Sequence, residues 1–365
     1  MRIKKAAETM TAKERVLKTF NLEKTDRVTI GYEANEGIHK RFAAALGVAD
    51  GNTESVMRAL GVDYRGVDAP YTGPFLFKDM PGRVTNPVDG FRMRWIEHQT
   101  GGYWDFCDFP LANADSETIA AFPVPNPDGF DYASVRGQIE AHEDFAVYIG
   151  NPGVPDIINS TGRIMGMEDT LVNLVNEDEA TLHFLNRRMN MRLGVLERML
   201  DKNKGEIDFM WLGEDLGTQI SPMISLGLFR KVIRPIHQKF IDLAKAYDLK
   251  VITHTCGSSS WAYEDFIEMG VNAVDTLQPE AVNMSPKYLK EHFGGRLSFR
   301  GCISTAGPLA YGSPEDVVAD VKNTLEIMMN GYGYHFAPTH AIQDNTPVEN
   351  LFAMYQTAHD YGVYR

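Results

Sequence analysis

The alternation of short apolar stretches with amphipathic segments constrains the fold of this chain more than any other feature. The pattern is most regular in the C-terminal half. There, strand-like stretches begin at residues 208, 251, 273, 297 and 334, and a helix-like segment follows each of them. This rhythm predicts a parallel sheet whose strands are connected by helices. The number of such units and the length of 365 residues favour a single (β/α)8 barrel domain over residues 1–365, rather than an open doubly wound sheet.

The N-terminal half fits the same plan less regularly. The capping box formed by Thr11 and Glu14 opens a helix, and the alternating stretch 28–33 predicts the first strand. Residues 145–150 predict a buried strand that ends at the following Asn-Pro-Gly, and the stretch around Met165 is expected to be a loop.

Residues 70–127 interrupt the pattern, because this stretch is rich in proline, glycine and aromatic residues. Within it, residues 92–97 predict a strand of a β-hairpin. A long irregular segment in a compact chain is usually a lid, a binding elaboration or a subunit contact. We therefore expect residues 70–127 to be an insertion that shapes the pocket or contacts another subunit.

Charge and composition restrict the possible partners and the location. The net charge of −13 argues against nucleic acid and against an anionic membrane surface as binding partners. No apolar run is long enough to span a bilayer, and no secretory signal peptide is expected. Three cysteines in a chain of this length do not form a disulfide framework, so a cytoplasmic, reducing location is expected. No glycine-rich nucleotide-binding motif is found.

The strongest chemical signal is a His-x-Cys motif at the end of a predicted strand. Apolar Val251 and Ile252 lead directly to His254 and Cys256. In a βα barrel, the carboxyl ends of the strands carry the functional residues. Imidazole and thiolate can bind the same metal ion, and zinc accepts both. The alternative is a half-buried histidine beside an inert core cysteine.

Two later residues compete for the position of a third metal ligand. His340 follows the last predicted strand, and it would supply an imidazole from a different part of the barrel. Cys302 follows the strand before it, but its neighbours Gly301 and Ile303 are typical of packing. Two strand ends that carry Cys or His, together with an open position, describe a catalytic zinc site rather than a structural one. His340 could also be a lone structural histidine.

Polar residues are expected at the same rim of the barrel. Glu214 and Asp215 follow the strand that begins at residue 208, and they are the predicted catalytic residues. One of them could bind the metal, protonate a leaving group or orient a metal-binding imidazole. They could equally be a pair of surface carboxylates. Glu33 and Gln278 also follow strands and are predicted to contact the substrate.

Together these motifs resemble the uroporphyrinogen decarboxylase superfamily over nearly the whole chain. The residues that carry the resemblance are Glu14-Arg15, Asp26-Arg27-Val28, Glu214-Asp215-Leu216-Gly217, His254-x-Cys256-Gly257, Gly270-Val271-Asn272-Ala273, Phe299-x-Gly301, Gly312-Ser313-Pro314-Glu315 and His340 with Thr346-Pro347-x-Glu349-Asn350. The resemblance implies a (β/α)8 barrel.

The start of the chain separates two branches of this superfamily. The true decarboxylases open with an arginine-rich segment that holds the many carboxylates of their substrate. Here the first strand leads instead to Glu33 and Glu36, which would repel a polyanionic porphyrinogen. The chain is more similar to the zinc-dependent methyltransferases that serve corrinoid proteins, namely coenzyme M methyltransferases and O-demethylase methyltransferases.

That branch carries His-x-Cys and a distant cysteine as zinc ligands. His254 and Cys256 match the first two ligands, and the third position falls on His340, which is a departure from the pattern. The resemblance implies one zinc ion per chain, a corrinoid (cobalamin) protein as partner, and a small molecule as methyl donor or acceptor.

The expected function is methyl transfer between such a molecule and the cobalt of the corrinoid, with zinc as the Lewis acid. Aromatic and methionine residues, among them Trp95, Met165 and Trp211, are expected to form an apolar substrate pocket. Such a pocket suits a methoxylated aromatic better than a small thiol such as coenzyme M. The alternatives are a decarboxylase-like lyase that acts on a smaller carboxylic acid, and a non-catalytic barrel that binds a partner.

Overall fold

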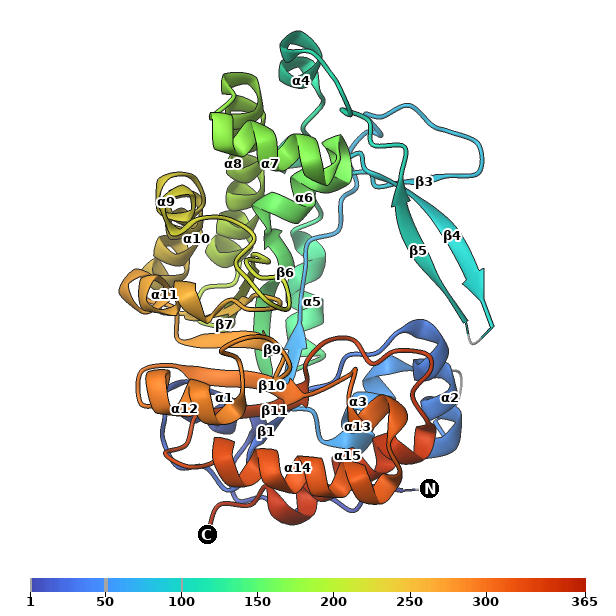
Figure 1. Cartoon of the computed structure of the whole chain (residues 1–365), viewed down its shortest axis with the longest axis vertical. Coiled ribbons are helices and arrows are strands. Elements are labelled where there is room, and N and C mark those ends of the chain that lie inside the picture. Colours follow the sequence, from blue (N-terminus) through green and yellow to red (C-terminus); the bar gives the residue numbers. More distant parts are fainter. Residues whose placement is uncertain (1, 49–51, 100) are drawn as a thin grey trace.

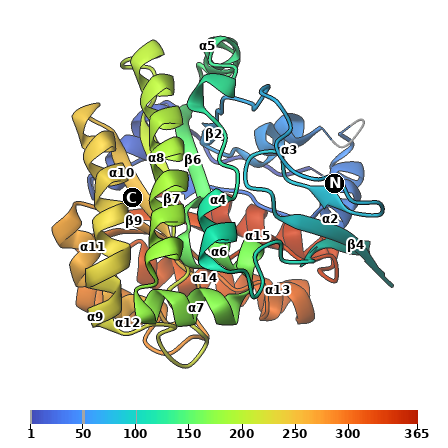
Figure 2. The same ribbon diagram turned by 90° about the horizontal axis from the view of Figure 1, so that it is seen from above.

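The computed structural model describes residues 2–48, 52–99 and 101–365. Eight parallel strands form one curled sheet in the order β1-β11-β10-β9-β8-β7-β6-β2, with helices around it (Figure 1 and, seen from above, Figure 2). The strands are β1 (Thr29–Ile30), β2 (Tyr64–Gly66), β6 (Ala146–Pro155), β7 (Phe209–Gly213), β8 (Lys250–His254), β9 (Ala273–Leu277), β10 (Ser298–Ile303) and β11 (Tyr334–Pro338). The predicted (β/α)8 barrel is confirmed.

The helices alternate with the strands along most of the chain. They are α1 (Ala12–Phe20), α2 (Glu36–Leu46), α3 (Thr53–Leu60), α4 (Ser116–Ala121), α5 (Ala133–Glu140), α6 (Ile157–Met165), α7 (Met167–Asn176), α8 (Glu179–Lys202), α9 (Leu226–Leu228), α10 (Arg234–Ala246), α11 (Tyr263–Met269), α12 (Pro286–Phe293), α13 (Pro308–Tyr311), α14 (Pro314–Met328) and α15 (Val348–Tyr361). No helix in the described residues combines the length and apolar character needed to cross a bilayer.

Most strands on the C-terminal side of the barrel are buried on both faces, which explains why their sequences are apolar runs. Every residue of β7, β9, β10 and β11 is buried, as is usual for parallel strands covered by helices. An aromatic layer fills part of the barrel interior, where Phe209 packs against the rings of Tyr64 and Tyr148. Phe20 at the end of α1 packs on this layer, with its ring centroid 5.2 Å from that of Phe209. The capping box predicted for α1 is confirmed.

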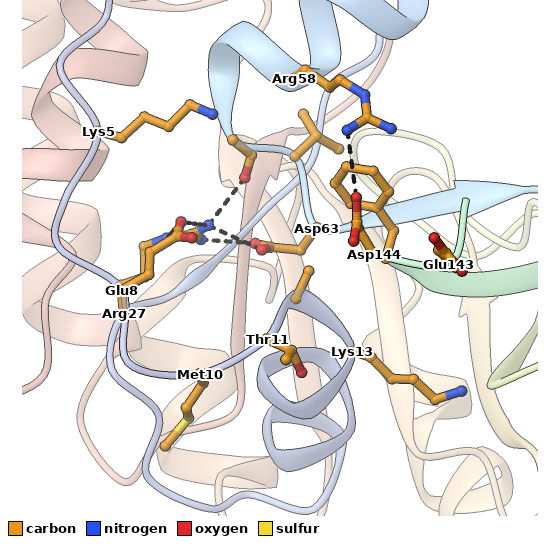
Figure 3. A pocket seen from close by; sticks show the side chains of 14 residues that line it. Lys5, Glu8, Met10, Thr11, Lys13, Arg27, Arg58, Asp63, Glu143 and Asp144 are labelled. Carbon is orange, nitrogen blue, oxygen red and sulfur yellow. Dashed lines mark hydrogen bonds and ion pairs between the residues drawn. The ribbon is translucent and has the colours of Figure 1, made fainter. Parts of the chain in front are cut away.

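The barrel closes where β1 meets β2, and Asp63 is at the centre of this seam. The backbone N–H of Asp63 donates to the carbonyl of Ile30 (3.1 Å), and the N–H of Ile30 donates to the Asp63 carboxylate (2.8 Å). The same buried carboxylate accepts hydrogen bonds from Arg15 (2.6 Å) and Arg27 (2.7 Å). Figure 3 shows Asp63 and Glu8 meeting around Arg27, in a pocket at this end of the barrel.

The segment between β2 and β6 carries a second, antiparallel sheet. It consists of β3 (Val84–Thr85), β4 (Arg92–His98) and β5 (Gly101–Cys107), and the end of this hairpin lies next to α2, where Trp95 and Gly101 line a pocket together with Glu36 and Lys40 (Figure 1). The predicted hairpin strand is therefore confirmed. A small apolar cluster joins the rest of this segment to α6 and α8 through Leu111, Ile119 and Phe184. A role of this insertion in the pocket or in a subunit contact stays a prediction.

Two local predictions were wrong. Strand β6 does not end at the Asn-Pro-Gly sequence but continues to Pro155, with its register to β7 shifting after Gly150. The stretch around Met165, expected to be a loop, belongs to helix α6. Its N-terminus carries no hydrogen bond from a local capping side chain, and its first N–H groups donate to Glu214, which is distant in sequence. A local sequence pattern cannot show such a cap.

We predict that Asp63→Asn lowers the free energy of unfolding by about 3 kcal/mol, because two buried guanidinium groups lose a shared charged partner. Urea unfolding with an unchanged m-value would measure this. The matched control is Asp144→Asn, at an exposed carboxylate 3.7 Å from Arg58 (Figure 3), which should change stability by no more than about 0.5 kcal/mol. Equal effects of the two substitutions would contradict the role of Asp63.

Candidate metal centre

His254, Cys256 and His340 come together at the carboxyl end of the barrel. His254 is the last residue of β8, Cys256 lies two residues beyond it, and His340 lies two residues beyond the end of β11. Strands β9 and β10 separate β8 from β11 in the sheet, so the curl of the barrel brings the three side chains together. Their candidate ligand atoms all lie within 4.8 Å of one another.

The pair His254 and Cys256 has the spacing of a tetrahedral metal site. Its Nε2 and Sγ atoms are 3.4 Å apart. Zinc–nitrogen and zinc–sulfur bonds of about 2.05 and 2.3 Å at a tetrahedral angle would place these two atoms about 3.6 Å apart. Two imidazoles and one thiolate also suit zinc by chemical type. The residues present therefore fit a zinc ion with three protein ligands.

The second nitrogen of the His254 ring is already engaged. Nδ1 lies 2.9 Å from a carboxylate oxygen of Asp275 and 2.6 Å from the hydroxyl of Thr276, both on β9. Because a carboxylate only accepts, Nδ1 donates its hydrogen to Asp275, and Nε2 is the nitrogen that faces Cys256 and can bind a metal once it has lost its own proton. Metal-binding histidines are commonly oriented in this way by a carboxylate.

Asp275 is in turn held by a charge from the barrel interior. Its other carboxylate oxygen accepts a 2.5 Å hydrogen bond from Arg300 on β10. Burial works against the ionised form of Asp275, but the Arg300 charge and the His254 hydrogen bond outweigh it and hold the pKa of this carboxyl well below its usual range. The guanidinium also donates to Glu33 (2.7 Å) and lies over the ring of Trp211, 4.5 Å from its centroid. Glu33 and Trp211, predicted to contact the substrate, thus lie around Arg300.

Asp215 and Gln278 hold the loop that carries Cys256. One oxygen of Asp215 accepts the backbone N–H of Cys256 (2.9 Å) and lies 3.8 Å from Nε2 of His254. The other oxygen accepts a hydrogen bond from the side chain of Asn159. Gln278 accepts the backbone N–H of Gly257 (2.8 Å), where φ is +67°. Both residues border the candidate centre, and their contacts fix the position of the thiol.

Glu214 is directed to a different part of the structure. It is fully buried, and its carboxylate accepts the N–H groups of Ile157 and Ile158 at 2.7 and 2.8 Å. A third contact, 2.8 Å, joins it to Nε2 of His237 on α10. These contacts use its oxygens to fasten α6 and α10 to the end of β7. Its predicted catalytic role receives no support from this position.

The remaining predicted residues lie outside the cluster of three. Cys302 is buried in the main core on β10, and burial raises the pKa of its thiol. Met165, the last residue of α6, is buried in the small apolar cluster with Leu111 and Phe184, and Trp95 is 45% exposed on β4, against Trp104. Sequence reasoning missed Asp275, although a charged residue within the apolar stretch of β9 was an available signal.

The protonation of the two nearest ligands opposes metal binding at low pH. Burial raises the pKa of the Cys256 thiol to about 11, and the nearby His254 only partly offsets this. Burial lowers the pKa of His254, but the hydrogen bonds to Asp275 and Cys256 outweigh it and raise this pKa well above its ordinary value. A metal ion must therefore displace protons from both groups.

Known proteins share the fold and part of the sequence pattern. Residues 203–361 match the sequence model of the uroporphyrinogen decarboxylase (URO-D) family. The predicted resemblance to this superfamily is confirmed. The URO-D match includes His254, Cys256, Asp275 and His340.

A solved structure supports the fold over the whole chain. The chain is similar to a methyltransferase from Methanosarcina mazei, with a TM-score of 0.66 and 15% sequence identity. The similarity covers 96% of this chain and 99% of the methyltransferase. Identity this low establishes a common fold and not a common activity. No curated protein matches the chain in sequence.

We predict that zinc affinity rises with pH between about pH 6 and pH 8. Each proton displaced from Cys256 or His254 contributes roughly a tenfold increase per pH unit. Competition with a chromogenic chelator at several pH values would measure this, and calorimetry in buffers of different ionisation enthalpy would count the protons released. Cys256→Ser should reduce that count. A pH-independent affinity would contradict the assignment of these two ligands.

Removal of the Asp275 charge, which orients His254, should lower the affinity for zinc without removing a metal ligand. We predict that Asp275→Asn lowers zinc affinity by roughly 10- to 100-fold. Zinc titration would measure the change, with circular dichroism to verify the fold. The control is Asp316→Asn, in the exposed capping box of α14, which should leave zinc affinity unchanged. Unchanged affinity in the Asp275 variant would show that this carboxylate does not support the metal.

Proposed function

We propose that this protein is a zinc-dependent methyltransferase that moves a methyl group between a small methylated molecule and the cobalt of a corrinoid protein. The observation that carries the proposal is the cluster of His254, Cys256 and His340 at the carboxyl end of the barrel. Three protein ligands leave one position for a substrate atom, as catalytic zinc sites do. The fold similarity to a methyltransferase is in keeping with this reaction.

Each residue of the centre has a definable task in such a reaction. Bound zinc would supply Lewis acidity toward the oxygen or sulfur that carries the methyl group. His254 and Cys256 would hold the ion in a fixed position because Asp275 and Asp215 hold them in turn. His340 is exposed and makes an edge contact with the His254 ring, at 6.0 Å between centroids. It would complete the ligand set from the opposite side of the mouth.

The charges in the barrel favour this reaction over decarboxylation of a polyanionic substrate. Such a substrate needs unpaired arginine side chains to bind its carboxylates. Arg300, the buried arginine next to the centre, already binds Asp275, Glu33 and the hydroxyl of Tyr64. A lyase that acts on a smaller carboxylic acid is the second candidate, because the matching family is named for a decarboxylase.

The test combines metal content with methyl transfer. We expect about one zinc per chain in the purified protein, and we expect His254→Ala to lose it. The zinc-loaded protein, mixed with a reduced corrinoid protein and a methoxylated aromatic or methyl thioether, should produce the absorption spectrum of methyl-cobalt. Cys302→Ala is the matched control, since it removes a thiol outside the cluster and should retain zinc and activity.

Two results would overturn the proposal. Protein without zinc that shows no methyl-cobalt with any donor would exclude it. Carbon dioxide release from a small carboxylic acid by zinc-free protein would favour the lyase instead.

A further inference from the structure

We propose that Asp156, rather than Glu214 or Asp215, is the carboxylic acid that exchanges a proton with the reacting atom of the substrate. This inference rests on the proposed function, because it assigns the acid–base group of the same site. Asp156 lies between the end of β6 and the start of α6. No sequence pattern pointed to it.

The side chain of Asp156 does not perform the task that its position would predict. Aspartate at a helix N-cap normally accepts an N–H group of the first turn. Asp156 occupies the N-cap of α6 with φ +40° and ψ 61°, and its side chain makes no capping hydrogen bond. Glu214 caps the helix in its place, by accepting the N–H groups of Ile157 and Ile158. The Asp156 carboxyl group is thereby left free for another use.

This carboxyl group is buried but only partly satisfied. Asp156 is 3% exposed, and its Oδ1 has no hydrogen-bond partner among the described residues. Its Oδ2 lies 3.5 Å from the guanidinium of Arg163, which is half-buried and stacks over Phe106 of the insertion at 4.8 Å. A buried polar atom without a partner is costly, and such atoms are typical of sites that bind a further group.

The backbone around Asp156 is fastened to the candidate metal centre. Its N–H donates to the carbonyl of Gly213 (2.8 Å), directly before Glu214 and Asp215. Asn159, one helical turn further, donates to Asp215, which accepts the N–H of Cys256. The carboxylate of Asp215 thus joins the first turn of α6 to the loop that carries Cys256.

The charges that face Asp156 come from four elements. Burial is the main cause that raises its pKa, to about 7, and the charges of Glu214 and Asp215 beyond β7 act in the same direction. Arg163 on α6 and His254 on β8 oppose this shift, and Arg188 on α8 also interacts with the carboxylate. A carboxyl group in such surroundings can give and take a proton near neutral pH, as a general acid–base group must.

The other two carboxylates are less suited to this task. Glu214 already accepts from two backbone N–H groups and meets His237. Both oxygens of Asp215 accept hydrogen bonds. Burial would raise the pKa of Asp215, but the His254 charge and the Cys256 N–H outweigh burial and lower it. Of the three, only Asp156 combines burial with an unused oxygen.

The proton balance of the step is simple. In demethylation, the bond between the methyl carbon and the donor oxygen or sulfur breaks, and the reduced corrinoid supplies the electron pair of the new carbon–cobalt bond. The electron pair of the broken bond stays on the oxygen or sulfur, which takes the proton of Asp156. Asp156 is left as a carboxylate. In the opposite direction, it accepts the proton of the thiol or hydroxyl group.

The first test requires no catalysis. Infrared difference spectra of the zinc-free full-length protein, between mildly acidic and mildly alkaline pH, should show the C=O stretch of a protonated carboxylic acid that titrates near neutral pH. The band should be absent in Asp156→Asn and present in the control Glu326→Gln, at an exposed carboxylate on α14. A band that persists in Asp156→Asn, or the absence of any band in the wild type, would overturn the proposal.

The second test uses the zinc-loaded protein with a reduced corrinoid protein. Asp156→Asn should keep its zinc and slow methyl transfer on the order of 10²- to 10⁴-fold. The loss should shrink for donors with an electron-poor ring, whose leaving oxygen needs no proton, and Asp156→Glu should restore part of the rate. An equal loss with every donor, or loss of zinc, would indicate a structural role and overturn the proposal.

The two tests separate this inference from the proposed function. A wild-type protein that binds zinc but methylates no corrinoid would refute the methyltransferase assignment. The infrared result would still decide whether Asp156 is a buried acid that exchanges a proton near neutral pH.

Discussion

The buried carboxylate of Asp275 is the interaction on which the candidate centre depends. One oxygen holds the imidazole of His254, and the other accepts from Arg300. A carboxylate without exposure to water is stable only when its charge is compensated, and the loss of one partner from a buried pair is strongly destabilising. The orientation of the metal-binding histidine is therefore set by an arginine in the middle of the barrel, on a different strand from the metal ligands.

Arg300 also connects the centre to the place where the barrel closes. Its side chain reaches from β10 to Glu33 after β1 and to the hydroxyl of Tyr64 on β2. Asp63, directly before Tyr64, joins β1 to β2 through hydrogen bonds to Ile30. The candidate metal centre and the closing strands are thus anchored at two adjacent residues, Tyr64 and Asp63. The barrel tolerates these charged groups among its apolar layers because each is compensated by an oppositely charged neighbour.

The parts of the fold that the sequence predicted are those determined by local periodicity. The strands of the C-terminal half and the capping box of α1 follow from residues that are adjacent in sequence. His254 and Cys256 were also recognisable locally, since a single residue separates them at a strand end. Helix α6 was not, because its cap is Glu214, and the role of Asp275 was not, because Arg300 lies on the next strand. Contacts between distant residues, which depend on how the barrel curls, determine the rest of the site.

The three carboxylates near the ends of β6 and β7 show why residue type alone does not assign a role. Glu214 and Asp215 are adjacent in sequence, yet one caps a helix and the other holds the thiol loop, because strand geometry directs alternate side chains to opposite sides. Asp156 occupies the N-cap position of α6, but its side chain does not cap the helix, because Glu214 accepts the first N–H groups instead. The capping of α6 from a distance is thus the structural reason that a buried acid with a free oxygen exists at the start of this helix. A local cap on this helix would occupy the only carboxyl group of the three that can still exchange a proton.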